Sequence, residues 1–239
     1  MLSGGVLIIG SLIWDRENGN RIRWRNDFLN QAGQIKVPAP IRYGRVSRGR
    51  CCTFSMVFSD ECNRPELKGT GILVPFANNP VDLRMLRVHT SELMKAERNK
   101  VDLDENVFNW AWGALAMSVN PVILNEISPK YDEANNLAAF WRKSYTKGFN
   151  PEHYKVGNEE CIISKEGILK FSWPDELDNY DFLIATATKP ERIVYPTAKN
   201  IAERMLVNEY SEYFFQNSEN GILNFQDDEI LEIMNASNN

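Results

Sequence analysis

The chain alternates between short apolar runs, which are typical of strands, and segments whose apolar residues recur every three or four positions, which are typical of helices. The apolar runs predict buried strands at residues 6–14, 51–59, 69–76, 108–121 and 181–190. The helical periodicity predicts helices at residues 24–33, 79–97, 132–145, 197–216 and 226–234. Prolines predict an extended segment at 37–46, and a turn at "KEG" predicts a hairpin at 160–173.

These elements do not follow the regular strand–helix–strand order that a parallel α/β sheet requires. We therefore expect an α+β protein with one mixed sheet or barrel and with helices packed outside it. No stretch has the composition of a linker between domains, so residues 1–239 are predicted to form a single domain.

The helix predicted over 79–97 carries an acid at the end of its apolar stripe. The stripe follows helical spacing and consists of Leu83, Leu86, Thr90, Leu93 and Glu97. Asn79 is the expected N-cap, with Pro80 at the first helical position. Because the stripe faces the core, we expect the Glu97 carboxyl to point inward, where burial and the negative helix end raise its pKa. The alternative is a surface glutamate paired with Arg98 or Lys100.

The first apolar run ends in a turn at Gly10 and Ser11, whose backbone N–H groups suit an anion. A dinucleotide-binding loop needs two more glycines after the strand, and Leu12, Ile13 and Trp14 stand in their place. A Walker-type loop is also missing, because no GK[ST] occurs. The sequence therefore predicts either a loop for an anion such as a carboxylate or a plain turn around a buried glycine.

Charge and cysteine content narrow the class of partner. With 27 basic and 32 acidic residues the net charge is −5, so we expect neither nucleic acid nor an anionic membrane as a partner. The interrupted N-terminal run predicts neither a signal peptide nor a membrane span. The cysteines form no CxxC pair, which favours buried thiols in a reducing cytoplasm over a disulfide framework or a zinc site. They are Cys51, Cys52, Cys62 and Cys161.

Other candidate residues are less specific. Arginine pairs with carboxylates through two hydrogen bonds, but "SRGR" is more typical of a solvated loop, so Arg48 and Arg50 are left out of the predicted site. Trp14 lies beside the turn, where it could wall a pocket. His89 is predicted to lie on a helix surface, and its separation from His153 is not that of metal ligands.

Taken in order, four segments resemble the gamma-glutamylcyclotransferase-like superfamily: "IGSLIW", "YGRVSRGRCCTFSMVF", "GTGILVPF" and a helix that ends in "ELMKAERN". The resemblance covers residues 6 to about 97 and, more weakly, 181–225. Residues 100–180 look like an insertion or elaboration. Ile9 stands where the family has a tyrosine, so any contact of that ring or hydroxyl is lost.

The resemblance implies a gamma-glutamylcyclotransferase-like fold and an enzyme that releases 5-oxoproline from a γ-glutamyl amine or peptide. Glu97 would be the general acid/base, and Gly10, Ser11 and Leu12 would anchor the α-carboxylate or oxyanion. No metal and no nucleotide cofactor is implied. The amine half of the substrate and the oligomeric state stay open.

The competing hypothesis is a non-catalytic small-molecule-binding or interaction module on the same fold. The replacement of the family tyrosine by Ile9 and the long 100–180 segment favour it. An active enzyme needs a pocket in which Glu97 faces residues 10–12, whereas a blocked cleft or a solvent-facing Glu97 would favour the module. A nucleotide-dependent enzyme, the third possibility, would need the phosphate loop that the sequence lacks.

Overall fold

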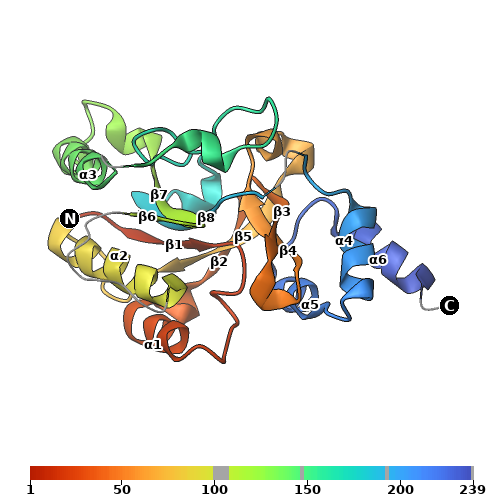
Figure 1. Ribbon diagram of the computed structural model, residues 1–239. Coiled ribbons are helices and arrows are strands. Elements are labelled where there is room, and N and C mark those ends of the chain that lie inside the picture. The colour runs from red at the N-terminus through yellow and green to blue at the C-terminus, as the bar shows by residue number, and fades with distance from the viewer. Residues whose placement is uncertain (99–107, 146–147, 192–193, 238–239) are drawn as a thin grey trace.

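A computed structural model describes residues 1–98, 108–145, 148–191 and 194–237 (Figure 1). Within them, six helices accompany a mixed six-stranded sheet, which curls into a half-barrel, and a two-stranded hairpin. The strands are β1 (Gly4–Ile8), β2 (Ile35–Ala39), β3 (Ile41–Ser47), β4 (Thr53–Phe58), β5 (Gly69–Pro75), β6 (Asn109–Trp110), β7 (Gly113–Val119) and β8 (Phe182–Thr188). The helices are α1 (Gly19–Phe28), α2 (Leu83–Arg98), α3 (Tyr131–Ser144), α4 (Ala198–Val207), α5 (Glu212–Glu219) and α6 (Asp227–Ser237). The expectation of an α+β protein is confirmed.

The strand order in the large sheet is β2-β5-β1-β8-β7-β6. The pair β1–β8 is parallel, with Val6 opposite Ile184, and the other pairs are antiparallel. All residues of β1 are buried, as expected of a central strand covered on both faces. In Figure 1, α1 and α2 pack below the sheet, α3 lies above it, and α4–α6 gather beyond the β3–β4 hairpin. Strand β7, from the segment that looks like an insertion, pairs with β8 inside this sheet.

Helix α2 begins later than the sequence predicts. Asn79 does not cap it, because the Asn79 side chain accepts from the N–H of Gly4 and donates to the Gly4 carbonyl. The Asp82 carboxylate instead accepts from the Met85 N–H, at the start of the helix. The stripe of the helix is buried from Leu86 to Leu93, whereas Leu83 is exposed and Glu97 is partly buried.

Three predicted elements are shorter or divided. The first strand stops at Ile8, because the N–H of Ile13 bonds the Gly10 carbonyl and turns the chain. The run 108–121 forms two strands, β6 and β7, around a tight turn. The helix predicted over 197–216 is divided into α4 and α5 by Glu209, whose φ of 50° lies in the left-handed region.

Other boundaries also differ. The helix expected at 24–33 begins earlier, at Gly19, because the Asn18 side chain caps it, and it ends at Phe28. The hairpin expected at 160–173 is reduced to one isolated bridge between Ile163 and Leu169. The first change moves the ends of a helix, whereas the second replaces two predicted strands by irregular chain.

The cysteines at the β3–β4 turn do not lie on a strand. Cys51 and Cys52 have φ values of 48° and 59°, in the left-handed region, and both side chains are exposed. The predictions that the strand begins at residue 51 and that these thiols are buried are therefore wrong for this pair. Cys62 is buried as predicted. None of the described helices is long and apolar enough to cross a lipid bilayer.

His89 is buried, not on the helix surface as predicted. Only 3% of it is exposed, and its ring lies 4.0 Å from that of Phe76 and 5.9 Å from that of Phe28. Among the described residues, no group bonds its Nδ1. Burial lowers the pKa of His89 from 6.5 to about 4.

We expect this histidine to make the protein sensitive to acid. Below pH 6.5 His89 becomes protonated in the unfolded chain, whereas in the folded chain it stays neutral down to about pH 4. The free energy of unfolding therefore falls as the pH drops through that range. From pH 6.5 to 5 the loss is about 1.6 kcal/mol. Urea denaturation at both pH values measures the free energy of unfolding. Between pH 6.5 and 5, His89→Phe should lose less of this free energy than the wild type, by the amount given above. An equal loss in both proteins would contradict the prediction.

Candidate active site

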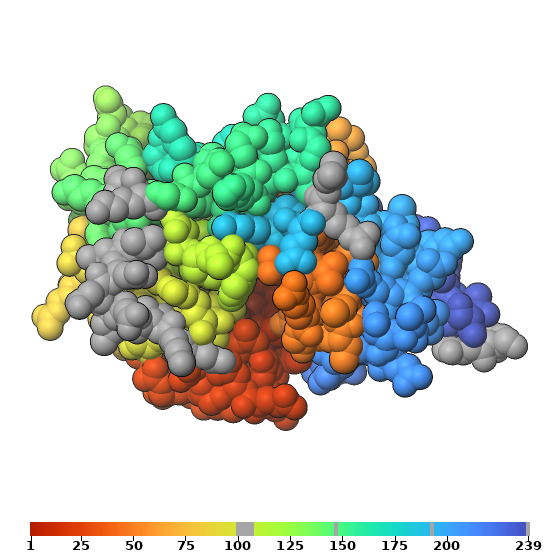
Figure 2. Space-filling model, in the orientation of Figure 1, coloured from red at the N-terminus to blue at the C-terminus, as the bar shows by residue number. Residues whose placement is uncertain are grey.

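A cavity of about 1150 Å³ opens beyond the carboxyl end of β1. Figure 2 shows the surface hollowed between the N-terminal segment and the β3–β4 hairpin. Its walls come from the turn after β1, the C-terminal end of α2, strand β8, the hairpin and α5. Gly10, Ser11, Leu12 and Glu97 all line it, so the structure brings together the residues that the sequence singles out.

Glu97 occupies the last turn of α2 and faces inward. Its side chain is 10% exposed, and its Oε2 lies 3.3 Å from Nη2 of Arg21. Burial raises the pKa of this carboxyl, while the charges of Arg21 and Arg50 and the Thr186 hydroxyl oppose the rise. The alternative of a surface pair with Arg98 is not observed, since that guanidinium lies over the Trp110 ring. Lys100 lies outside the described residues.

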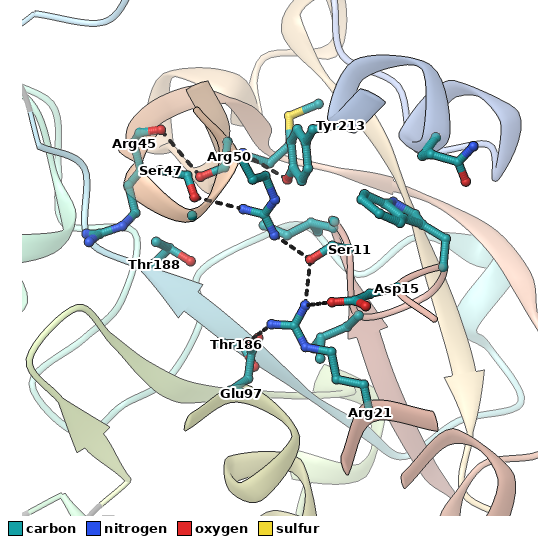
Figure 3. A pocket seen from close by; sticks show the side chains of 18 of the residues that line it. Ser11, Asp15, Arg21, Arg45, Ser47, Arg50, Glu97, Thr186, Thr188 and Tyr213 are labelled. Carbon is teal, nitrogen blue, oxygen red and sulfur yellow. Dashed lines mark hydrogen bonds and ion pairs between the residues drawn. The ribbon is translucent and has the colours of Figure 1, made fainter. Parts of the chain in front are cut away.

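Arg21 connects the turn after β1 to helix α2. The Asn18 side chain caps α1 by accepting from the backbone N–H of Arg21, and the Arg21 side chain lines the cavity. Its Nη1 donates to Asp15 at 2.6 Å and to the Ser11 hydroxyl at 3.0 Å, and its Nε donates to the Ala96 carbonyl at 3.1 Å. One guanidinium therefore holds two carboxylates and the turn in a fixed arrangement (Figure 3).

Asp15 stays ionised beside this arginine. Burial favours its neutral form, but the N–H groups of Glu17 and Asn18 and the charge of Arg21 hold the pKa of Asp15 below its usual value. Asp15 and Glu97 thus share one cation, and burial acts on both carboxyls, but the net shift of the pKa is upward only at Glu97.

The turn after β1 presents free donors to the cavity. Within the described ranges, no group accepts a hydrogen bond from the backbone N–H of Gly10, Ser11 or Leu12. The turn itself is closed by later N–H groups, because Ile13 and Trp14 donate to the carbonyls of Gly10 and Ser11. Successive free N–H groups of this kind form an anion-binding concavity.

Arg50 enters the cavity from the opposite side of Ser11. It donates to the Ser11 hydroxyl and, at 3.3 Å, to the Ser47 hydroxyl. Its guanidinium lies 4.4 Å from the centroid of the Tyr213 ring. The prediction of a solvated loop is therefore wrong for Arg50, although it holds for the exposed Arg48.

Gly10 is required by its close approach to α5. A Cβ at this position would lie 2.5 Å from the Tyr213 hydroxyl, which is fixed because it accepts from the Met56 N–H and because Arg50 covers the ring. This contact supports the plain-turn interpretation of Gly10 without excluding an anchoring role for its N–H.

We expect Gly10→Ala to destabilise the protein by about 1–3 kcal/mol through overpacking. In the Tyr213→Phe background the clashing oxygen is gone, so the same alanine should cost less than half as much. Chemical denaturation of the four proteins in this double-mutant cycle measures the difference. Equal costs in both backgrounds would show that the hydroxyl does not restrict this position.

The sequence gives no signal for three of the cavity residues. Arg21 belongs to a helix without an apolar stripe, while Thr186 and Tyr213 come from segments more than 170 positions after the turn. Trp14 does line the cavity, as expected, and its Nε1 donates to Asn217 at 2.8 Å. Pairing of β1 with β8, and packing of α5 on the hairpin, bring these groups to the site.

No family model, no curated protein and no solved structure matches this chain. What the cavity can do therefore follows from its own chemistry. In the described part of the chain, no three histidine, cysteine or acidic side chains gather as a metal site would require. The cavity instead offers one buried carboxyl with a raised pKa, opposite a group of hydrogen-bond donors.

Proposed function

We propose that the protein is a gamma-glutamylcyclotransferase-like enzyme, which releases 5-oxoproline from a γ-glutamyl amine or peptide. One observation carries the proposal: the Glu97 carboxyl and the free N–H groups of Gly10, Ser11 and Leu12 line the same cavity. These are the acid/base and the anchor that the resemblance implies, and the curled mixed sheet agrees with the fold that it implies.

In the proposed reaction, nucleophile and electrophile belong to one molecule. The α-amine of the γ-glutamyl group attacks its own γ-carbonyl, so that a C–N bond forms and closes a five-membered ring. The original amide C–N bond breaks and the amine leaves. The enzyme has to hold the chain folded and move protons, because the reacting atoms already share one molecule.

Glu97 is suited to both proton transfers. Its carboxylate takes a proton from the α-ammonium group, which frees the attacking lone pair, and returns a proton to the departing nitrogen. A carboxyl with a raised pKa works better in this role, since a base is most effective when its pKa lies near the working pH. Partial burial also keeps bulk water from competing for the proton.

The turn after β1 supplies the electrostatic half of the mechanism. Its free N–H groups stabilise negative charge, either on the α-carboxylate or on the oxygen that becomes anionic when the ring closes. Fixed donors of this kind need no reorganisation when the charge develops. The four cysteines are free, and we place the reaction in a reducing cytoplasm.

The direct test is the release of 5-oxoproline by the wild-type protein from glutathione, γ-glutamyl dipeptides and γ-glutamyl amides. Each substrate is paired with its α-glutamyl isomer, which cannot form the ring by this route. Release from one or more γ-glutamyl compounds, and from no isomer, is the expected result. Absence of product across the whole set would favour the binding module.

A further inference from the structure

The centre of the cavity, around Ser11, contains hydrogen-bond donors that lack an acceptor. The Ser11 hydroxyl accepts from Nη1 of Arg21 and from Nη2 of Arg50. Both lone pairs of the oxygen are then in use, and its own proton is left to donate. No described residue accepts that proton, and the neighbouring N–H groups are free as well. Only an acceptor, and preferably an anion, satisfies such a group.

The two arginines around Ser11 differ in charge balance. Arg21 is ion-paired with both Asp15 and Glu97. Arg50 has no carboxylate within ion-pair distance in the described part of the chain, and two serine hydroxyls use only two of its five N–H donors. Arg45, the other partly buried arginine of the cavity, is paired with Glu191 at 2.9 Å. Of the partly buried arginines of the cavity, Arg50 is therefore the one without a carboxylate partner in the described part of the chain, whereas Arg16 and Arg48 line the cavity from exposed positions.

The positions of these groups fix an orientation. Figure 3 shows Ser11 between the two guanidiniums, with Arg50 on one side and Arg21 with Glu97 on the other. The α-carbon of a γ-glutamyl group carries both a carboxylate and an amine. If the amine faces Glu97, the carboxylate faces away from it and toward Arg50, with the Ser11 hydroxyl between them.

We propose that Arg50 binds the α-carboxylate of the substrate and, together with the Ser11 hydroxyl, restricts the site to γ-glutamyl compounds whose α-carboxylate is free. This inference rests on the proposed function for the identity of the substrate. It adds a charged ligand from the β3–β4 hairpin to the anchor, which otherwise consists of backbone N–H groups. Tyr213 supports the guanidinium from behind and keeps it in the cavity.

The test uses the product 5-oxoproline, which keeps the carboxylate, and 5-oxoprolinamide, in which an uncharged amide replaces it. Calorimetry measures both affinities for the wild type, Arg50→Gln and Arg50→Lys. Arg64→Gln is the matched control, because Arg64 is exposed and does not line the cavity. Thermal melting shows whether each variant is folded. If Arg50→Gln does not fold, Arg50→Lys replaces it in the comparison, because it keeps the positive charge.

We expect Arg50→Gln to weaken the binding of 5-oxoproline by about 10- to 100-fold, as loss of a charge-assisted pair does. Binding of 5-oxoprolinamide should be unchanged. The affinity of Arg50→Lys should fall between those of the wild type and Arg50→Gln, and Arg64→Gln should match the wild type.

Equal affinity of the wild type and Arg50→Gln for 5-oxoproline would overturn the inference, as would failure of the wild type to bind it. These outcomes are separable from failure of the proposed function. Carboxylate-dependent binding without any release from γ-glutamyl substrates would leave Arg50 as an anion ligand and remove the enzyme. Release of 5-oxoproline with an unchanged KM in Arg50→Gln would support the enzyme and remove Arg50 as the ligand of the α-carboxylate.

Discussion

Replacing Glu97 by glutamine should lower the rate of 5-oxoproline release by about 10²- to 10⁴-fold, the usual contribution of a general acid/base. Glutamine keeps the shape of the side chain, and it can still accept from Arg21 through its carbonyl oxygen. It cannot take up the proton of the α-ammonium group. The loss should therefore appear in kcat, measured by product release under saturating substrate, with KM little changed.

Glu92 provides the control for this substitution. It lies on the same helix, five positions earlier, and is also largely buried, but its carboxylate is paired with Arg23 and Lys95 and does not line the cavity. Glu92→Gln therefore changes the same functional group in the same helix without touching the site. Equal activity of the wild type and Glu97→Gln would remove Glu97 from the mechanism. An equal loss in Glu92→Gln would indicate a structural effect of α2.

Replacing Arg21 by methionine should move the acid limb of the pH–rate profile to higher pH. The base must be deprotonated to act, and the positive charge of Arg21 opposes the rise that burial causes in the pKa of Glu97. Removal of that charge raises the pKa further, so a larger share of the enzyme is protonated and inactive at any acidic pH. The profile of kcat/KM against pH measures the position of the limb.

Arg21→Lys and Arg23→Met complete this experiment. Lysine restores the charge beside Glu97, so its acid limb should return toward that of the wild type. Arg23 lies on the same helix, but it is half exposed and bonds Glu92, so Arg23→Met should leave the limb in place. An unshifted limb in Arg21→Met would mean that Arg21 does not set the pKa of the catalytic group.

The sequence was sufficient to place Glu97, because a helical stripe determines which side of a helix is buried. From Leu86 to Leu93 the stripe is apolar or uncharged, and the next position in the series is the acid. The apolar run at 51–59 likewise predicted a buried strand, and every residue of β4 is buried, although Cys51 and Cys52 before it are exposed. Local periodicity thus decides burial wherever one element packs one face on the core.

Elsewhere, backbone conformation or tertiary packing overruled the local pattern. Glu209 adopts a left-handed conformation and divides a predicted helix, although glutamate favours helices. His89 lies beside the stripe and is nonetheless buried, since Phe28 of α1 and Phe76 after β5 pack against it. A single helix seen in the sequence cannot report which neighbours cover its flanks.

The largest omission concerns the arginines of the site. Arg50 lies in a polar, glycine-containing turn, which is typical of solvent-exposed chain. It turns inward because it donates a hydrogen bond to the Ser11 hydroxyl and stacks on the Tyr213 ring. These two partners come from opposite ends of the sequence. Such partners are visible only after β1 and α5 have been placed on either side of the hairpin.

The parallel pairing of β1 with β8 has a consequence for how the chain matures on the ribosome. Strands β1, β2 and β5 lie within the first 75 residues and can pair as soon as they emerge, whereas β8 begins at Phe182. Until then the second edge of β1 is an open row of N–H and C=O groups, available to another chain. Late completion of a nonlocal sheet is slow, so the nascent protein passes through an aggregation-prone stage during synthesis. Two residues that line the cavity are synthesised late, Thr186 within β8 and Tyr213 after it. The cavity is therefore completed only when β8 has paired with β1.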